Sequence, residues 1–511
     1  MNIIDLQTTE SAQADVLIIG GGLAGIMAAI EARKPGADVV LVSKSRVGLG
    51  NNSAVALGGI AAAAGAGWRD PADRYEDHVR DTLEAGRFVN DRRLVEAMVP
   101  EIEAAIRAIE TYGVRFKKRG ESLSVTQVPG HSYPRTIFPE EGGGTSITRP
   151  MRDHALRLGV RHFEGTVITR ILRDGDVVTG AFGINGDGQT TAFQAGVVIL
   201  AAGGMGRLYL FGDNPPDATG DGYALAYEAG LTLRDMEFVQ FVPGTPAYEI
   251  WVGRNGAKLR NRLGEDVLAK HGLTDLKRMT RDAVSRAAYL ELTAGPGVEG
   301  KWLTLDASNV PETSWEKLQS ILPARLRGIG KNLPMSPPEA HFFMGGVEID
   351  EHTATDLKGL YACGEICAGV HGANRLGSNA LSECLVFGAR AGREAAQWAR
   401  SAGRRPIRPD TLADELARLD KITDRRGSAI PATLVQELRN VMWSKVGIVR
   451  DGPGLQQAIE EIRHIRDGLG EVSVEDTKGL LALLSLQNMV SLSDLIARAA
   501  LARTESRGAH Y

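Results

Sequence analysis

Continuous apolar runs that end in glycine mark this chain. Residues 15–19 (Asp-Val-Leu-Ile-Ile) lead directly into residues 20–25 (Gly-Gly-Gly-Leu-Ala-Gly), and small apolar side chains follow at 26–30. Residues 38–42 and 195–202 have a similar, almost unbroken apolar character, which is typical of parallel strands buried on both faces. The succession of strand, glycine turn and helix predicts an α/β, Rossmann-like fold.

The pattern divides the chain into three domains. Alternating strands and helices occupy residues 1–236 and return at 346–400, so we predict a nucleotide-binding domain that an insertion splits in two. The insertion, residues 237–345, has mixed patterning with charged helical pieces. Helical spacing dominates residues 410–511. We interpret the following apolar residues there as a helical core rather than a partner surface: Leu480, Leu484, Leu492, Leu495 and Ile496.

The glycine turn has the spacing of a dinucleotide site. Gly20 permits the tight turn, Gly22 lets a pyrophosphate approach the backbone, and Gly25 lets the helix pack closely on its strand. The helix N-terminus supplies free N–H groups and a partial positive charge. A glycine-rich turn without a ligand is the alternative. The second strand ends in Ser43 and Lys44, where many such folds place an acidic ribose ligand, and this departure weakens the case for NAD.

Composition and charge exclude several classes of protein. The 511 residues are 43% hydrophobic and 24% charged, as in an ordinary globular enzyme of two or three domains. Lys plus Arg number 59 against 63 Asp plus Glu, and this net charge of -4 disfavours a nucleic-acid partner. The first seven residues lack the basic start and apolar core of a signal peptide, and the small-residue stretch 61–67 is too short to span a bilayer. We therefore expect a cytoplasmic protein without a membrane span.

Further motifs follow one another in order along nearly the whole chain. Besides the glycine turn, they are residues 51–60 (NNSAVALGGI), 130–132 (GHS), 219–222 (TGDG), 236–241 (MEFVQF), 341–346 (HFFMGG), 364–365 (GE), 372–379 (GANRLGSN) and 505–511 (ESRGAHY). This series resembles the flavoprotein subunits of fumarate reductase and succinate dehydrogenase, with L-aspartate oxidase. The resemblance implies FAD rather than NAD, in a split Rossmann-like FAD-binding domain with an inserted α+β capping domain and a C-terminal helical domain.

The resemblance also implies which residues hold FAD. Asp221 and Glu365 are expected to accept hydrogen bonds from ribose or ribityl hydroxyls, because one carboxylate accepts two of them. Asn52 stands where succinate dehydrogenases carry the histidine that bonds covalently to FAD, so we expect a non-covalent cofactor. His131 either positions the cofactor or bonds its own loop. The expected FAD contacts are Gly20, Gly22, Leu23, Ala24, Gly25, Ser43, Lys44, Asn51, Asn52, Ser53, Gly58, Gly59, Val167, Ala202, Gly203, Asp221, Glu365, Arg375, Ser378, Asn379 and Leu381.

The family chemistry moves a hydride between flavin N5 and a carbon beside a carboxylate, while a protein group handles the proton on the adjacent carbon. By resemblance, Arg375 and His341 bind one substrate carboxylate, since a guanidinium offers a bidentate fork and an imidazole offers a further donor. Arg281 matches the proton-transferring arginine of the family. An arginine normally stays protonated, so this role rests on the resemblance.

Two departures from the family pattern bear on the substrate. After Gln240-Phe241 the dicarboxylate enzymes carry a histidine, whereas this chain has Val242, followed by Thr245 in the same expected substrate pocket. The threonine and glutamate motifs that relay protons to the proton-transferring arginine in the family are also replaced in this chain. Glu249 or Arg254 is the alternative relay. We expect a substrate with one carboxylate and a neutral or apolar far end against Val242 and Trp251, and not a symmetric four-carbon dicarboxylate.

The three cysteines bear on metal binding and redox chemistry in the chain. Cys363, Cys367 and Cys384 cannot supply the four thiolates of an iron–sulfur cluster, so we expect no metal in the chain itself. Cys363 and Cys367 flank Glu365, and we interpret them as small buried residues near the flavin, with a redox pair as the alternative.

The sequence therefore predicts an FAD-dependent oxidoreductase that acts on a CH–CH group beside a carboxylate. L-Aspartate oxidase is the first alternative, although Val128 occupies the stretch in which those enzymes carry a glutamate suited to the substrate ammonium. The second alternative is an electron-transfer subunit that requires an iron–sulfur or other electron-transfer partner.

Overall fold

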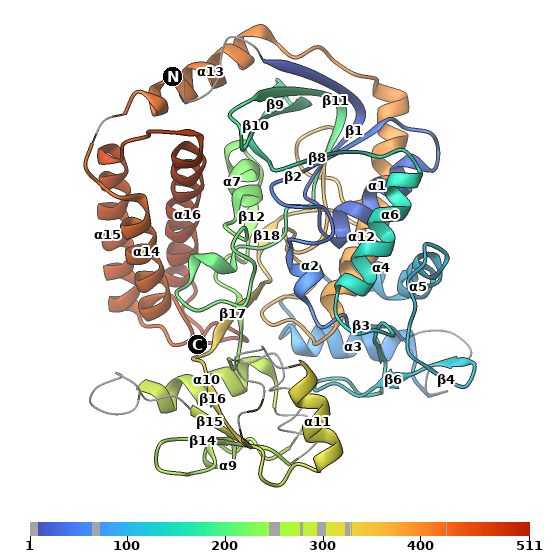
Figure 1. Cartoon of the computed structure of the whole chain (residues 1–511), viewed down its shortest axis with the longest axis vertical. Helices are drawn as coiled ribbons and strands as arrows, with labels where there is room; N and C mark the ends of the chain where they lie inside the picture. Colours follow the sequence, from blue (N-terminus) through green and yellow to red (C-terminus); the bar gives the residue numbers. More distant parts are fainter. Residues whose placement is uncertain are drawn as a thin grey trace.

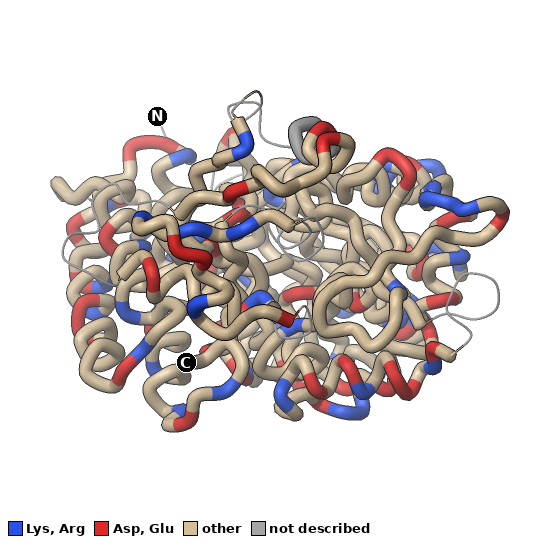
Figure 2. The backbone as a smooth tube through the Cα atoms, turned by 90° about the horizontal axis from the view of Figure 1, so that it is seen from below, with Lys and Arg blue, Asp and Glu red and all other residues tan. Residues whose placement is uncertain are grey.

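The computed structural model describes residues 9–63, 72–244, 256–275, 279–293, 303–321, 328, 330–425 and 427–511. These residues form a main body around one large sheet, a smaller α+β unit at one end and a helical bundle along one flank (Figure 1). The predicted fold class is confirmed. Lys and Arg are interspersed with Asp and Glu along the backbone tube in Figure 2, and their totals nearly balance, 59 against 63.

The large sheet has seven strands in the order β8-β2-β1-β11-β10-β9, with β19 also paired to β11. Its strands are β1 (Glu10–Ile19), β2 (Val39–Ser43), β8 (Arg161–Glu164), β9 (Thr166–Asp174), β10 (Val177–Asn185), β11 (Thr190–Leu200) and β19 (Leu360–Ala362). The strands β8, β2, β1, β11 and β19 run parallel, whereas β9 and β10 pair antiparallel. The three apolar runs singled out in the sequence are therefore strands of one parallel core, as predicted.

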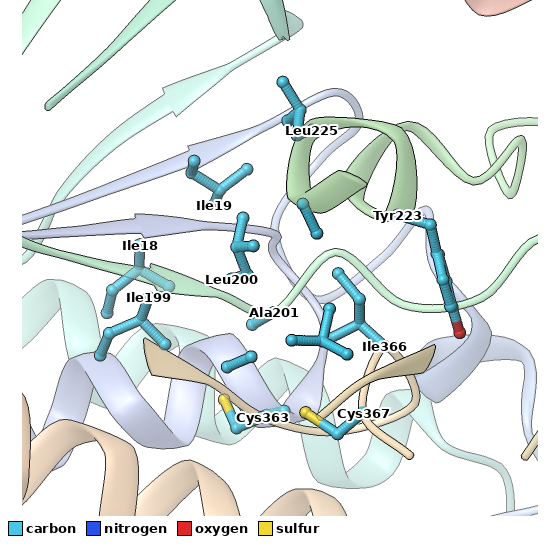
Figure 3. Close-up of a cluster of buried hydrophobic side chains, with 14 of the residues drawn as sticks. Ile18, Ile19, Ile199, Leu200, Ala201, Tyr223, Leu225, Cys363, Ile366 and Cys367 are labelled. Carbon is cyan, nitrogen blue, oxygen red and sulfur yellow. The ribbon is translucent and has the colours of Figure 1, made fainter. Parts of the chain in front are cut away.

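Strand β19 completes this core from the second half of the chain. Its three residues pair with Val198, Ile199 and Leu200 of β11, beyond the point where β10 stops pairing. Figure 3 shows the apolar side chains that fill the carboxyl ends of β1, β11 and β19, including Ile19 and Ile366. Because ligands of open α/β sheets bind outside the carboxyl ends of the strands, this edge is where a cofactor site is expected.

Two helices lock the sheet from one side. Helix α1 (Leu23–Arg33) packs along α12 (Asn379–Ala402), and the contact depends on residues without side chains. A Cβ atom on Gly388 would lie 2.6 Å from the Ala24 carbonyl oxygen, and one on Gly392 would lie 2.3 Å from that of Ala28. Because the two helices approach so closely, the glycine turn before α1 lies near the segment before α12.

The inserted unit has its own core. Strands β14 (Lys258–Arg260), β15 (Leu303–Asp306) and β16 (Asn332–Met335) form an antiparallel sheet, covered by α9 (Val267–Lys270), α10 (Arg281–Thr293) and α11 (Glu312–Ile321). The unit connects to the body through β13 (Val239–Val242) and β17 (Glu339–Phe343), which pair antiparallel. Strands β12 (Leu233–Arg234) and β18 (Gly346–Val347) pair in the same way beside them. The chain thus enters and leaves the insertion side by side.

The C-terminal part is helical, with α13 (Pro409–Thr423), α14 (Pro431–Lys445), α15 (Gly452–Gly468) and α16 (Thr477–Ala502). The leucines and isoleucine predicted as its core pack there, Leu495 being only partly buried. Among the described residues, α16 is the one helix long and apolar enough to cross a membrane, but 56% of its most apolar window is buried inside the chain. Core helices of soluble proteins share this property, so α16 is weak evidence for a membrane span.

The remaining elements surround the glycine turn and the sheet. They are α2 (Asn52–Val55), β3 (Ile60–Ala61), α3 (Tyr75–Ala85), α4 (Arg92–Met98), α5 (Ile102–Thr111), β4 (Lys118–Arg119), β5 (Ser122–Leu123), β6 (Val125–Thr126), β7 (Thr136–Ile137), α6 (Thr145–Arg157) and α7 (Asp221–Glu228).

Candidate functional site

A cavity of about 530 Å³ lies at the carboxyl ends of the parallel strands. It is lined by the glycine turn, by the loops that follow β2, β11 and β19, and at one end by Val242, Arg281 and His341 from the inserted unit and its connecting strands. The cavity therefore joins the dinucleotide motif to the residues expected to bind substrate.

The glycine turn leaves no room for side chains on its protein side. Gly20 has φ 123°, and a Cβ there would lie 2.1 Å from the carbonyl oxygen of Ala201. A Cβ on Gly25 would lie 2.0 Å from the carbonyl oxygen of Gly20. At Gly22 the nearest atom to a Cβ is the Ser53 hydroxyl at 3.5 Å, because this residue faces the cavity. The turn can therefore bring backbone against a pyrophosphate.

The N-terminus of α1 is suited to an anion. No acidic residue lies in its first turn, and its N-cap residue Gly22 provides no side chain to cap it. The Leu23 amide donates to the Ser53 hydroxyl at 3.1 Å. The neighbouring Asn51 caps α2 through the Ala54 amide and donates to the Gly21 carbonyl at 3.0 Å. These contacts fix the turn and keep the positive end of the helix directed at the cavity.

Asn52 and Glu365, which both line the cavity, form a hydrogen-bonded polar group. The Asn52 amide nitrogen donates to Glu365 Oε2 at 3.0 Å and to Asn214 Oδ1 at 3.1 Å. Burial raises the pKa of Glu365 to about 7, against the opposing effect of the Asn52 hydrogen bond. The side-chain amide oxygen Oδ1 of Asn52 is buried and has no hydrogen-bond partner within the described ranges. An unsatisfied buried acceptor beside a carboxyl fits a ligand that carries hydroxyl donors.

Lys44 and Asp221 pair in the cavity wall near the glycine turn. Lys44 Nζ lies 2.8 Å from Asp221 Oδ2 and 3.0 Å from the Thr219 hydroxyl. The second Asp221 oxygen accepts from Asn488 of α16 at 2.9 Å. Burial by itself raises the pKa of Asp221, but Lys44 and the hydrogen bonds outweigh it and lower the pKa below its usual value. A carboxylate held ionised in this way is a suitable acceptor for sugar hydroxyls.

Arg375, His341, Arg281 and Val242 line one cavity, as the motifs predicted. The Arg375 side chain is buried, and its guanidinium lies 4.6 Å from the centroid of the Phe342 ring. Val242 is 5% exposed, so an apolar surface lies in the wall that holds two arginines. Charged donors and an apolar wall in one enclosed space can hold an anionic group at one end of a small molecule.

Gln240 links Arg281 to the Arg375 segment through hydrogen bonds. Its amide nitrogen donates to Asn374 Oδ1 and to the Arg375 carbonyl, both at 2.9 Å. Its amide oxygen accepts from Arg281 Nη1 at 3.2 Å. Asn374 in turn donates to Asp282 of α10 at 2.9 Å. One glutamine on β13 therefore fixes the arginine of the inserted unit relative to the arginine of the body.

His341 has a carboxylate partner that the motifs did not indicate. Its Nδ1 lies 2.7 Å from Asp213 Oδ2, and Asp213 Oδ1 accepts from Asn214 at 2.9 Å. Burial lowers the pKa of His341, and the Arg281 and Arg375 charges lower it further, although Asp213 opposes both. Asp213 lies in an ordinary loop with no recognisable motif, so the sequence carried no signal for it.

The cavity contains most of the expected FAD contacts. Of the 21 residues expected, 19 line it, and Gly25 and Asn379 do not. Gly25 acts where α1 meets its strand. The Asn379 side chain lies 2.8 Å from His78 Nε2 and donates to Thr82 at 2.9 Å, so it is bonded to α3, and its contact with FAD stays a prediction.

Several other predicted residues lie away from the cavity or outside the described ranges. His131 Nε2 lies 2.8 Å from the Gly377 carbonyl, which fits the role of bonding a loop, and burial lowers the pKa of His131 to about 4. The neighbouring Arg135 is buried in ion pairs with Asp73 and Asp81. Four expected residues lie outside the described residues: Thr245, Glu249, Trp251 and Arg254.

The cysteines are free and buried, and Cys363 and Cys384 line the cavity. Burial raises the pKa of all three thiols, so they remain protonated at neutral pH. This state fits small buried residues better than reactive thiols. Within the described ranges, no group of three His, Cys, Asp or Glu side chains is placed to hold a metal ion.

Comparisons with known proteins agree with this geometry. Residues 15–381 match the family described as FAD binding domain, and residues 435–511 match fumarate reductase flavoprotein C-term. The chain is 38% identical to one subunit of the fumarate reductase (CoM/CoB) of Methanothermobacter marburgensis, over 98% of this chain and 94% of that protein. It is 32% identical to L-aspartate oxidase of Streptomyces coelicolor, over 98% and 88%. A solved quinol-fumarate reductase with menaquinol molecules superposes with a TM-score of 0.89 at 30% identity, over 98% and 92% of the two chains.

Proposed function

The chain belongs to the flavoprotein family of fumarate reductase and succinate dehydrogenase and is an FAD-dependent oxidoreductase, and we propose that it acts on the carbon–carbon bond next to a substrate carboxylate. The observation that carries this proposal is the continuity of the cavity. One cavity is lined both by the dinucleotide cradle and by Arg281, His341 and Arg375. A substrate bound by these residues has its reacting carbons beside the cofactor.

FAD fits the residues that form the cradle. Gly22 and the N-terminus of α1 would bind the pyrophosphate, Asp221 would accept from the ribose, and Asn52 with Glu365 would bond the ribityl hydroxyls or the ring. When bound, FAD supplies the hydride donor or acceptor of the reaction. Asn52 has no imidazole nitrogen, so we propose that the cofactor is held without a covalent bond.

The protein residues supply binding and a proton. Arg375 and His341 hold one substrate carboxylate, and this charge pairing draws electrons from the adjacent carbons. Arg281 donates or accepts the proton at the carbon next to the one that exchanges hydride. Its hydrogen bond to Gln240 fixes the direction in which its remaining N–H groups point. Where the bound cofactor and substrate displace water from the cavity, each of these electrostatic interactions is strengthened.

The far end of the substrate faces an apolar wall. Val242 is buried and lines the cavity where the dicarboxylate enzymes carry a histidine, so a second carboxylate there has no imidazole to bind it. We propose a substrate with one carboxylate and a neutral or apolar far end, and not a symmetric four-carbon dicarboxylate. The name of the Methanothermobacter relative, fumarate reductase, supports the reaction type and makes fumarate the reference compound for this proposal.

Electron delivery involves a second protein in this proposal. The Methanothermobacter relative is named as one subunit of its enzyme, which favours an assembled enzyme here as well. We propose an iron–sulfur protein or another electron-transfer protein as the partner. The cytoplasmic location predicted from the sequence stays a prediction.

The experiment is a screen of unsaturated and saturated carboxylic acids with the purified protein under nitrogen. Unsaturated acids are tested for reoxidation of the reduced flavin and saturated acids for bleaching of the oxidised flavin, so substrate and direction are read together. L-Aspartate is tested separately in air-saturated buffer with peroxide detection, because an L-aspartate oxidase is among the relatives and peroxide forms only when oxygen reoxidises the flavin. Turnover of L-aspartate without turnover of any other acid contradicts the proposal. We expect no turnover of L-aspartate, because Val128 lines the cavity and cannot pair with an ammonium.

A further inference from the structure

We propose that Asp213 is a positioning residue that fixes His341 with Nδ1–H on its carboxylate and Nε2 toward the cavity, so that binding of a substrate carboxylate takes up one proton. The inference rests on the proposed function, because it concerns the group that His341 binds. It goes beyond that function in making substrate binding itself dependent on pH.

The geometry selects the nitrogen that faces the substrate. Asp213 Oδ2 lies 2.7 Å from Nδ1 of His341, and both residues line the cavity. Because an ionised carboxylate only accepts hydrogen bonds, Nδ1 must carry a hydrogen. No hydrogen bond to Nε2 occurs in the part of the chain that is described, and the His341 side chain is 28% exposed. Nε2 is therefore the ring nitrogen available to a ligand.

Asp213 is held in this position by its own bonds. Asn214 donates from one amide nitrogen to Asp213 Oδ1 at 2.9 Å and to the His341 carbonyl at 3.0 Å. The Asp213 backbone amide donates to the Ala340 carbonyl at 3.3 Å. The loop that carries Asp213 is thus tied to β17 on both sides of the imidazole. The carboxylate cannot leave Nδ1 without breaking these bonds.

Burial and the two neighbouring arginines keep His341 neutral when no ligand is bound. The charged groups that face it are Asp213 from the loop, Arg281 from α10 and Arg375 from the segment before α12. Two arginines and burial lower the pKa of His341, against the single carboxylate that raises it. Asp213 stays ionised, since the His341 contacts and Arg281 lower its pKa although burial opposes them.

A neutral His341 in this tautomer presents a lone pair at Nε2, and a substrate carboxylate also presents lone pairs. Two acceptors do not form a hydrogen bond. When the carboxylate binds, a proton from solvent forms the Nε2–H bond, and the imidazolium then lies between the substrate carboxylate and Asp213. No electrons move in this step. Binding of one carboxylate therefore takes up one proton from the solution. The affinity for the carboxylate falls about tenfold for each pH unit above the pKa of free His341.

The test uses the FAD-loaded, oxidised protein and benzoate, a planar carboxylate with an apolar far end and no CH–CH bond that this chemistry can oxidise. Calorimetric titrations in buffers of different ionisation enthalpy, from about pH 7 to about pH 9 where free histidine is mostly neutral, give the number of protons taken up. We expect close to one proton for the wild type. In Asp213→Asn the amide can donate to Nδ1, which permits the Nε2–H tautomer, so we expect no proton uptake and an affinity independent of pH.

Two further variants separate this role from a general loss of structure. His341→Gln removes the titrating group and is expected to bind benzoate without proton uptake. Glu394→Gln changes a second histidine–carboxylate pair, with His352 at 3.1 Å on the surface, and is expected to keep the full uptake of the wild type. Flavin content and the unfolding temperature are measured for each protein.

The outcomes are distinct. Proton uptake near zero in the wild type, or unchanged uptake in Asp213→Asn, overturns the role of Asp213. A merely structural role predicts weaker binding of Asp213→Asn at every pH with the same pH dependence, which also contradicts the proposal. If neither benzoate nor fumarate binds the wild type at any pH, the proposed function itself is wrong and the inference falls with it.

Discussion

Arg281 and Gln240 meet across the boundary between the inserted unit and the strand that leads into it, with Nη1 of the arginine 3.2 Å from Oε1 of the glutamine. The glutamine cannot rotate freely, because its amide nitrogen is bound to Asn374 and to the Arg375 carbonyl. The position of the proposed proton carrier thus depends on the segment that carries the proposed carboxylate-binding residue. The proposed proton carrier and the segment that carries the proposed carboxylate-binding residue are thus linked through one amide.

The first prediction concerns Arg281. Arg281→Lys keeps the charge but loses the planar fork that reaches both Gln240 and the substrate, so turnover is expected to fall by roughly two to four decades, the usual effect of a positioned acid or base. Flavin content and stability should change little. The matched control is Arg286→Lys on the same helix, whose guanidinium lies against the Tyr511 ring instead. Steady-state kinetics measure the turnover of both variants. If Arg281→Lys turns over as fast as the wild type, Arg281 is not the proton carrier.

The second prediction tests Val242. A buried carboxylate that faces an apolar side chain loses hydrogen bonds worth roughly 1.5–3 kcal/mol each, or about one to two decades in affinity. Fumarate and succinate should therefore be poor substrates beside carboxylates with a neutral far end. Val242→His should shift the ratio of kcat/KM values toward the dicarboxylates. If the wild type uses fumarate as well as the best mono-carboxylate, another residue binds the second carboxylate and the substrate proposal is wrong.

The third prediction concerns the attachment of FAD. Asn52 bonds Asn214 and Glu365 and offers no nitrogen that can form a covalent bond to the flavin. Precipitation of the protein in acid should leave all of the flavin in the supernatant. Fluorescence of the washed pellet is the measurement, and flavin retained by the chain contradicts a non-covalent cofactor.

The fourth prediction follows from Glu365, whose pKa burial raises to about 7 from an ordinary value of 4.5. The folded flavin-free protein keeps this proton over a range in which the unfolded chain releases it. The stabilising contribution is therefore complete below about pH 4.5 and is lost as the pH rises to about 7, a change of roughly 3 kcal/mol. In urea unfolding, Glu365→Gln should not show this fall in the free energy of unfolding with pH. The variant Glu348→Gln, at an exposed position, should show the same fall as the wild type. Parallel curves for wild type and Glu365→Gln would rule out the raised pKa.

Local motifs predicted most of the residues that line the cofactor half of the cavity. The glycine spacing and the apolar runs act over a few residues, so the strand, turn and helix could be derived from a single stretch of sequence. The long apolar strands of the sheet were predictable for the same reason. The short antiparallel ladders that join the insertion to the body were not, because each pairs residues about a hundred positions apart.

The supporting residues of the site were not predictable. Asp213 meets His341 across 128 positions, and Asn488 meets Asp221 across 267, so no local pattern indicates either contact. For Asn379 the motif suggested a cofactor contact, which stays a prediction, while the fold shows its side chain bonded to His78 and Thr82 of α3. Motifs indicate which residues take part in the chemistry, while the hydrogen bonds that orient them appear only in the folded chain.

The most direct test of the central claim follows the reoxidation of reduced flavin by unsaturated carboxylates under nitrogen, in a stopped-flow instrument. The account predicts saturable reoxidation by at least one such acid in the wild type. Arg375→Met should lose it by two decades or more, as expected when a buried charge pair is removed, and Arg400→Met, an exposed arginine at the end of α12, should behave as the wild type. Failure of every unsaturated carboxylate to reoxidise the flavin, or equal rates with and without the Arg375 guanidinium, would contradict the account.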